Sequence, residues 1–440
     1  MKEIPYHLSI LLLVLNAITI QIATGLVHKI PTRMHKLPPE FAKQRLAQKY
    51  ANNPQMLELL THSASLEVSS DSPEKKNRTL PLSKDTGTWH TVQVADISVG
   101  TPPQRFTVEI NWDYDLNMEL VDSNATFLSG SDIGAMRLFN TSASSTYSSV
   151  VGGYSDTVTS SDGHRGQDIV HLNGQDLNLT FAVLDSVYYY YLNAHAIDGI
   201  LGLSPADQRT KPKVDMNLTT VMKQIGNQLD SPVVSVWTES SRNGDGIGQI
   251  TLGALDTDNC ESNWIFMPKT EAGYYTSGYT VHLATMEGVW LNGTQQTFKA
   301  NVDMSITPER SGITIPNDWV PLFKNISKAV WDDDVQEYVV DCDTTKLGNV
   351  TFRVGGHGAG ANSLTYNLTI TGADYTQYYE FYDVCYLLYH TGVKTNSRSS
   401  TPVTLGRNFV RNHCLAYNLN DNKIGIADSK IQNRRFMDYE

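Results

Sequence analysis

The sequence predicts a mostly β protein with two related lobes. From Trp89 onward, short alternating or β-branched runs are separated by Gly, Asn and Ser, a pattern typical of antiparallel strands. Helical spacing is clearest in two short stretches, 217–228 and 316–330. A chain of 440 residues is long for one hydrophobic core and comfortable for two. The expected strands are 91–99, 105–110, 168–172, 177–184, 233–237, 280–284 and 351–354.

Each half of the chain contains the same coarse pair of segments. In the first half, an apolar segment ending in aspartate (108–113) is followed later by an apolar segment containing Leu-Gly (197–203). In the second half, the corresponding segments are 299–303 and 403–409. Two lobes of related structure would produce this repetition.

Composition and charge narrow the class of protein. Hydrophobic residues make up 40% of the chain and charged residues 18%, which is ordinary for a globular protein. The net charge is -12, and no basic stripe is present that could neutralise phosphates. We therefore expect no nucleic-acid partner, and an acidic or extracellular compartment.

The N-terminus predicts entry into the secretory pathway. Lys2 precedes a mostly apolar run over 10–20, and small residues follow at 23–25, as in a signal peptide cleaved near Gly25. The run is shorter than the roughly 20 residues that a membrane-spanning helix needs. We expect a secreted protein, or one in the lysosomal or endosomal lumen, with no membrane partner; an uncleaved anchor is the alternative.

Sequons and cysteines fit that compartment. Four cysteines lie in the second half of the chain and allow three disulfide pairings in an oxidising lumen. They form no C-x-x-C pair or cluster with histidines, so the sequence predicts no metal site and no cofactor. The N-x-[ST] triplets begin at Asn77, Asn124, Asn140, Asn178, Asn217, Asn292, Asn325, Asn349 and Asn367.

A basic segment follows the signal peptide. Residues 26–50 contain six Lys or Arg and the single acid Glu40, whereas the rest of the protein is acidic. This segment could lie across an acidic cleft, or it could be a solvated basic helix. The polar stretch 66–88 reads as a linker or cleavage region.

Several motifs resemble the pepsin family of aspartic proteases. Residues 26–31 (LVHKIP) resemble the start of a pepsinogen propeptide, and 97–104 (ISVGTPPQ) resemble the strand and turn before the first catalytic loop. Residues 198–203 (DGILGL) are similar to a first-lobe strand, and 404–409 (TLGRNF) and 422–427 (NKIGIA) to the closing strands of the second lobe. The five motifs occur in the family's order.

The resemblance implies a bilobal pepsin-like acid protease fold with a cleft between two β lobes. Each lobe of such a protease supplies one aspartate from an Asp-Thr/Ser-Gly loop. The two carboxyl groups share one proton, because carboxylates about 3 Å apart cannot both ionise; one activates water and the other donates to the peptide carbonyl. The hydroxyl after each aspartate joins the two loops, and the glycine lets backbone amides approach.

The resemblance also implies an organisation for this chain. The expected parts are a signal peptide (1–25), a propeptide-like segment and linker (26–75), an N-terminal lobe (89–265) and a C-terminal lobe (266–430). The implied disulfides are Cys342–Cys385 and Cys260–Cys414. The implied partner is a peptide or protein ligand in the cleft of a monomer, and Asp198 is implied to be structural.

Both catalytic loops depart from the family pattern. Residues 302–307 read VDMSIT, which keeps Asp303 but puts Met304 at the hydroxyl position and Ser305 at the glycine position. In the first lobe, a gapless alignment puts Asn111 at the catalytic position. A shift of two residues puts Asp113 there instead, at the cost of two extra residues in an alternating strand.

The flap that should cover the cleft is altered too. Counting back from 166–170, the position of the usual flap tyrosine falls on Asp156, with Tyr154 as an alternative. Loss of that tyrosine would weaken the exclusion of water. The sequence thus predicts a secreted homologue that has lost or nearly lost hydrolysis and keeps a peptide-binding cleft. The alternative is an active endopeptidase at acidic pH with Asp113 and Asp303 as its dyad.

Overall fold

The computed structural model describes sixteen stretches of the chain, and the account below is confined to them. They are 28–36, 91–112, 118–127, 136–156, 161–187, 197–204, 220–229, 231–238, 247–270, 279–289, 293–306, 312–333, 337–355, 365–379, 384–390 and 403–431. The signal-peptide prediction, the linker 66–88 and Asp113 lie outside these residues.

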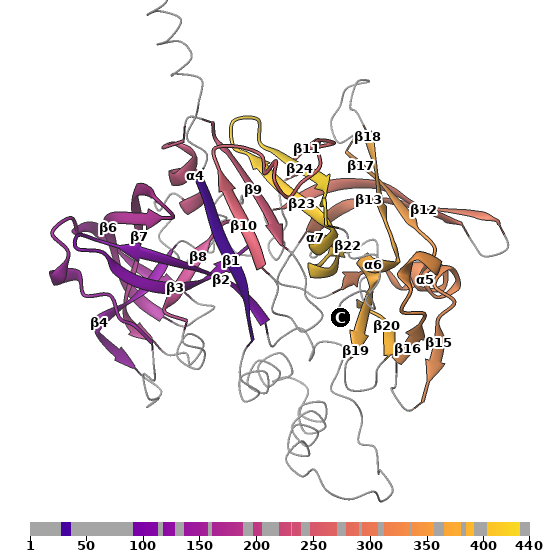
Figure 1. Cartoon of the computed structure of the whole chain (residues 1–440), viewed down its shortest axis with the longest axis horizontal. Coiled ribbons are helices and arrows are strands. Elements are labelled where there is room, and N and C mark those ends of the chain that lie inside the picture. The colour runs from indigo at the N-terminus through magenta and orange to yellow at the C-terminus, as the bar shows by residue number, and fades with distance from the viewer. Residues whose placement is uncertain are drawn as a thin grey trace, which may run out of the picture.

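A 13-stranded sheet extends from one side of the molecule, where β6 and β7 lie, to its centre (Figure 1). Its order is β11-β24-β23-β9-β10-β1-β2-β3-β8-β4-β7-β6-β5, so strands from both ends of the chain meet in it. Its members are β1 (His28–Lys36), β2 (Thr91–Val99), β3 (Gln104–Asn111), β4 (Glu119–Phe127), β5 (Ser148–Asp156), β6 (Ser161–Leu172), β7 (Gln175–Val187), β8 (Gly199–Gly202), β9 (Val233–Thr238), β10 (Ile247–Leu252), β11 (Ile265–Pro268), β23 (His413–Asn418) and β24 (Lys423–Asp428).

Two further sheets are built from strands that lie between Thr280 and Leu405 (Figure 1). The seven-stranded sheet has the order β18-β17-β12-β13-β22-β14-β21, and the four-stranded sheet has the order β15-β16-β20-β19. Their members are β12 (Thr280–Val289), β13 (Gln295–Ile306), β14 (Ile313–Thr314), β17 (Val350–Gly355), β18 (Thr365–Ile370), β21 (Tyr389–His390), β22 (Val403–Leu405), β15 (Val330–Asp332), β16 (Glu337–Val340), β19 (Thr376–Tyr379) and β20 (Val384–Leu387).

The described helices are short. They are α4 (Val221–Gly226), α5 (Val320–Ile326), α6 (Gly372–Tyr375) and α7 (Arg407–Asn412), with single 3-10 turns at η1 (Thr141–Ala143), η3 (Asn317–Trp319) and η4 (Thr344–Lys346). None of the helices in the described part of the chain is long and apolar enough to cross a membrane.

The predicted secondary structure is largely confirmed. All seven expected strands are present, and the mostly β class is correct. Of the helix expected over 217–228, the described residues form α4, which begins at Val221 and ends at Gly226. The helix expected over 316–330 was too long: α5 ends at Ile326, Lys328 has a positive φ of 54°, and Val330 begins β15.

Alternation of side chains explains why these runs form strands. In β7, the inward side chains Leu177, Leu179, Phe181 and Val183 are all fully buried, and they pack in one core with residues of both halves. Burial of this kind is worth about 1.5–3 kcal/mol per large apolar side chain. β3 is buried on both faces over its last six residues, as expected of a strand with parallel pairing.

Both implied disulfides are present. Cys260 is bonded to Cys414, and Cys342 to Cys385, with sequence separations of 154 and 43 residues. The first bond connects the segment before β11 with β23, so it crosslinks the large sheet. The second connects the turn after β16 with β20 in the four-stranded sheet.

Candidate functional site

The first catalytic strand of the family corresponds to β3. β3 pairs in parallel with β8, so that Ile110 lies opposite Leu201 and Asn111 opposite Gly202. The amide of Leu203 donates to the carbonyl of Asn111 at 2.8 Å, which fixes the end of the strand. Asn111 is the last residue of β3 and is only 8% exposed.

The register of β3 bears on the choice between Asn111 and Asp113. From Gln104 to Glu109, β3 pairs with β2 without any shift, and from Val108 to Asn111 it pairs with β8 without any shift. No bulge takes up two extra residues before the strand ends. The strand itself therefore favours the gapless alignment, with Asn111 at its end; Asp113 lies outside the described residues.

Trp112 occupies the position after Asn111, where the family has a hydroxyl. Its side chain is 1% exposed, and its indole N–H donates to Oε1 of Gln93 at 3.0 Å. Its ring meets Tyr279 edge-on, with ring centroids 6.0 Å apart. An indole at this position has no hydroxyl to share with the second loop and fills the space beneath the strand end instead.

The second catalytic strand corresponds to β13. β13 pairs in parallel with β22, so that Met304 lies opposite Val403, Ser305 opposite Thr404 and Ile306 opposite Leu405. This is the same arrangement as in the first lobe, because Leu201 and Leu405 each precede the glycine of a Leu-Gly pair. Two parallel strand pairs thus carry the two halves of the site.

The repeated pair of segments predicted that Asp303 is the last residue of its strand. The structure shows that it is not. β13 continues through Met304 and Ser305 to Ile306. Asp303 lies opposite His282 in the antiparallel pairing with β12 and is half-buried. Met304 is fully buried in the core and Ser305 is 2% exposed, so both are interior strand residues.

The two Leu-Gly pairs allow the two strands to be superposed residue by residue. Ile110 faces Leu201 and Ile306 faces Leu405, so these isoleucines are equivalent. Asp303 precedes Ile306 by three positions, as Thr107 precedes Ile110. Asn111, by contrast, follows Ile110 directly. Asp303 and Asn111 therefore occupy different positions along the two equivalent strands.

Tyr279 connects the two halves of the site. It lies directly before β12, is fully buried, and its carbonyl accepts from the amide of Ile306 at 2.8 Å. Its hydroxyl donates to the carbonyl of Leu203 at 3.4 Å, and its ring contacts Trp112. Neither Tyr279 nor Gln93 was predicted from the sequence. Gln93 could have been noticed in the sequence, because it places an amide side chain at an inward position of an otherwise apolar strand.

The hairpin β5–β6 takes the place of the flap. Asp156 is the last residue of β5 and pairs with Ser161, but its side chain is outside the described residues, as is the turn 157–160. Tyr154 lies in β5, is 6% exposed, and its hydroxyl donates to the carboxylate of Glu119 on β4. In this structure Tyr154 is thus a buried residue of the hairpin base.

Asp198 has the structural role that the resemblance implied. It is 1% exposed and accepts from the amides of Thr107 and Arg137 at 2.6 and 2.7 Å. The guanidinium of Arg137 lies 2.6 Å from its carboxylate. Asp198 therefore ties β3 to the segment 136–140, and its hydrogen-bonding capacity is used within the fold.

Part of the basic segment packs on the acidic body. Residues 28–36 form β1, a strand and not the helix weighed as an alternative. Lys29 pairs with Asp258, and Arg33 pairs with Asp96 at 2.7 Å. The hydrogen bond from Lys29 lowers the pKa of Asp258. Burial works to raise the pKa of Asp96, but hydrogen bonds from Arg33 and Thr107 outweigh burial and lower it.

Comparison with known proteins agrees with this architecture. The family model for eukaryotic aspartyl protease matches residues 93–429, so the chain belongs to that family. It is 28% identical to aspartic protease 17 of Caenorhabditis elegans over 77% of this chain and 83% of the relative. It is 25% identical to mouse cathepsin E (75% and 78% covered) and 25% identical to gastricsin of Callithrix jacchus (76% and 80% covered).

Pepsin-like proteases bind peptide substrates in a cleft between their lobes, and this chain is a homologue with the two strand pairs that carry such a site. The resemblance drawn from its motifs is confirmed.

Proposed function

We propose that this chain is a pepsin-family homologue that binds a peptide or protein segment in its cleft without hydrolysing it. The observation that carries the proposal is the end of β3, where the paired register puts Asn111, and not an acid, opposite Gly202. An amide cannot take a proton from water at any pH between 3 and 7. A peptide carbonyl or amide could still be held there by hydrogen bonds.

The second lobe supports the same proposal. A proton-sharing dyad needs two carboxyl groups at equivalent strand ends, within reach of one water. Asp303 lies three positions before the end of β13 and is held opposite His282 within the ladder. A carboxylate inside a paired strand is poorly placed to meet a partner that follows the end of β3.

The alternative is an active acid endopeptidase with Asp113 and Asp303 as its dyad. It requires the backbone after Trp112 to fold back so that the carboxyl group of Asp113 reaches that of Asp303. The buried position of Trp112, with its indole bonded to Gln93, argues against such a rearrangement.

One assay separates the two functions. The purified mature chain is incubated with denatured globin from pH 3 to 7, with and without pepstatin. We expect no pepstatin-sensitive cleavage, because a site without a carboxyl pair lacks the base and the acid together. Fluorescence anisotropy with labelled globin peptides should nevertheless show binding that peptide competitors reverse.

The controls use the two candidate acids. Asp113→Asn and Asp303→Asn should leave peptide binding and the absence of cleavage unchanged. Pepstatin-sensitive turnover by the native chain, abolished by either substitution, would show that the alternative is right. Absence of both cleavage and peptide binding would contradict the proposed binding function.

We further propose that the chain matures as a secreted or lumenal glycoprotein, with 1–25 as signal peptide, 26–75 as propeptide-like segment and linker, and lobes at 89–265 and 266–430. Asn325 is the least suited sequon, since Ser327 is 1% exposed and its hydroxyl donates to the carbonyl of Phe323. Asn77, Asn217 and Asn292 are outside the described residues. The exposed candidates for glycans are Asn124, Asn140, Asn178, Asn349 and Asn367.

A further inference from the structure

Two histidines of β6 face carboxylates of the neighbouring strand β7. Nδ1 of His164 lies 2.8 Å from Oδ2 of Asp185, and Nδ1 of His171 lies 2.6 Å from Oδ1 of Asp176. Both aspartate side chains are more than half exposed, and exposed pairs of this kind are weak by themselves. The two pairs are alike, so the difference between the two histidines lies at the second ring nitrogen.

That second nitrogen meets a different kind of atom in each case. Nε2 of His164 lies 2.8 Å from the hydroxyl of Tyr147, which is able to donate or accept a hydrogen bond. A neutral His164 therefore satisfies both of its partners. Nε2 of His171 lies 3.1 Å from the carbonyl oxygen of Gly100, which only accepts. Because the carboxylate of Asp176 also only accepts, His171 fills both contacts only as an imidazolium with two N–H groups.

The groups around His171 favour its charged form. Burial works to lower the pKa of His171, but the hydrogen bonds to Asp176 and Gly100 and the negative charges of Asp176 and Asp168 outweigh burial and raise it. Asp168 lies on β6 itself and is 1% exposed, and Asp176 lies on β7. From β2 the facing residue is Ser98, which carries no charge. Among the described residues, no cation offsets the two acids.

His171 joins two turns of the large sheet. On one side is the turn between β6 and β7, where Asn173 and Gly174 have positive φ values of 44° and 88°. On the other side is the turn that follows β2, where the carbonyl of Gly100 faces the imidazole. This second turn leads into β3, the strand that ends at Asn111. The contact of His171 with Gly100 thus acts on the start of the strand that carries half of the candidate site.

The turn after β2 is fastened from its far side by neutral groups. The amide of Thr101 donates to the hydroxyl of Ser144 at 3.0 Å, and the amide of Ser145 donates to the carbonyl of Thr101 at 2.8 Å. A Cβ atom at Gly100 would lie 2.6 Å from Oγ of Ser144, so the two segments approach closely. None of these groups titrates between pH 5 and 8. Among the described contacts of this turn, the one with His171 therefore responds to protonation in that range.

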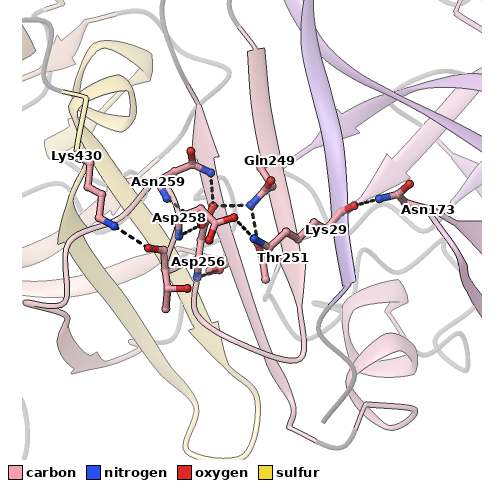
Figure 2. Close-up of polar contacts among 10 residues, drawn as sticks. Lys29, Asn173, Gln249, Thr251, Asp256, Asp258, Asn259 and Lys430 are labelled. Carbon is pink, nitrogen blue, oxygen red and sulfur yellow. Dashed lines mark hydrogen bonds and ion pairs between the residues drawn. The ribbon is translucent and has the colours of Figure 1, made fainter. Parts of the chain in front are cut away.

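The turn between β6 and β7 has a further contact, with β1. The side-chain amide of Asn173 donates to the carbonyl of Lys29, as Figure 2 shows. Neither group titrates between pH 5 and 8. The turn therefore keeps this contact whether His171 is charged or neutral, and a change of charge acts on the bond between His171 and Gly100.

From these contacts we propose that His171 is a pH-sensitive contact that fastens the turn before β3 in acid. As an imidazolium it donates to Asp176 and to the carbonyl of Gly100. When the imidazole loses one proton to water, it keeps the charge-assisted bond to Asp176 and turns the lone pair of Nε2 toward Gly100. The turn is then held by one hydrogen bond fewer. This inference does not depend on the proposed function, because it holds whether or not the cleft hydrolyses peptides.

The direction of the pH effect follows from the raised pKa of His171 in the folded state. The stabilisation is fully present below the unfolded value of 6.5 and is lost as pH rises through the folded pKa. The turn should therefore be held more firmly at pH 5 than at pH 8. A protein that moves from a neutral to an acidic lumen would be tightened at this turn on arrival.

The test follows the charge of His171 and the closure of the turn in the same protein. The full chain is incubated in deuterated buffer from pH 8 to pH 5. Exchange at the imidazole C2 position reports the titration of His171, and backbone exchange over 97–104, corrected for the intrinsic rate at each pH, reports the turn. We expect His171 to titrate above pH 6.5. Protection over 97–104 should rise about 2- to 10-fold in acid, the range for one net hydrogen bond.

Three variants isolate the contact. His171→Gln keeps a donor for Gly100 but has no proton to lose, so protection over 97–104 should no longer change with pH. Asp176→Asn removes the carboxylate, so the titration of His171 and the change in protection should both move to lower pH. His164→Gln alters the other histidine of β6 and leaves the turn untouched. It is the matched control and should leave both readings unchanged.

Several outcomes would overturn the proposal. Protection over 97–104 that does not rise between pH 8 and pH 5 would show that the turn does not respond to His171. A rise that persists in His171→Gln, or that disappears in His164→Gln, would place its origin elsewhere. If His171→Gln fails to fold, Asp176→Asn decides alone. An unshifted titration of His171 would then count against the inference, and parallel shifts of the titration and the protection to lower pH would support it.

Discussion

The two strand pairs β3–β8 and β13–β22 share a backbone plan but differ in what they present. In each, an isoleucine lies opposite the leucine of a Leu-Gly pair. The first strand ends at Asn111, whereas the second carries its aspartate three positions before its end. The hydrogen-bonded ladder and the buried core therefore hold the scaffold, while the polar side chains at the strand ends can change without loss of the fold.

The regions also differ in their covalent support. All four cysteines lie in the second half of the chain, and the pair Cys260–Cys414 fastens the end of the chain to the large sheet. Strands β2 to β8 have no cysteine and depend on packing and hydrogen bonds. The predictions below test how far this difference reaches, beginning with the largest expected effect.

The disulfide that closes the longer loop should contribute more to the free energy of unfolding. Replacing Cys260 and Cys414 by Ala should cost about 5 kcal/mol of unfolding free energy, and replacing Cys342 and Cys385 about 4, in the chain-entropy model. The reason is that the first pair spans 154 residues and the second 43. Urea unfolding measures both. A larger loss from the Cys342–Cys385 pair would mean that local strain or residual structure dominates.

Restoring the family's Thr-Gly residues after Asp303 should destabilise the fold and give no proteolytic activity. Met304 is fully buried in the core, so Met304→Thr with Ser305→Gly leaves a cavity and a buried hydroxyl, at a cost of about 2–5 kcal/mol. Met304→Leu is the volume-matched control and should cost less than about 1.5 kcal/mol. Pepstatin-sensitive cleavage by the double variant would show that these residues form a catalytic loop.

The ion pair on β1 should contribute little, and only above acidic pH. The pKa of Asp96 is lower in the folded state than in the unfolded state. Its contribution is therefore present above the unfolded pKa and is lost as pH falls through the lowered folded pKa. Asp96→Asn should reduce stability at pH 7 by less than about 1 kcal/mol, since the pair is exposed. Parallel melts at pH 7 and pH 2 should show a smaller difference at pH 2 than at pH 7.

The smallest effect is expected for Asp303. Asp303→Asn keeps the size of the side chain within the ladder, and the unfolding free energy should change by no more than about 0.5 kcal/mol. Asp303→Leu is a useful companion, because it tests tolerance of an apolar side chain at this half-buried position. A change in peptide affinity of tenfold or more in Asp303→Asn would place Asp303 at the site and restore the symmetry between the lobes.

The strands and the family could be predicted from the sequence alone, and the family resemblance implied the disulfide partners. Alternating runs such as 91–99 and 177–184 specify strands locally, because each inward residue needs only a face to bury. Motifs around Leu-Gly and at 97–104 identified the family, and the family implied Cys260–Cys414 and Cys342–Cys385.

The positions of Asp303 and of β1 depend on contacts between segments that are far apart in the chain. The position of Asp303 relative to the end of β13 depends on the register between β13 and β22. That register involves a segment far away in the chain. The basic residues of 26–50 suggested a segment lying across an acidic cleft or a solvated helix. In the strand observed over 28–36, Ile30 and Thr32 point inward while Lys29 and Arg33 point outward. A short strand of this kind is stable only between two neighbours, and its neighbours β2 and β10 are brought together by the rest of the fold.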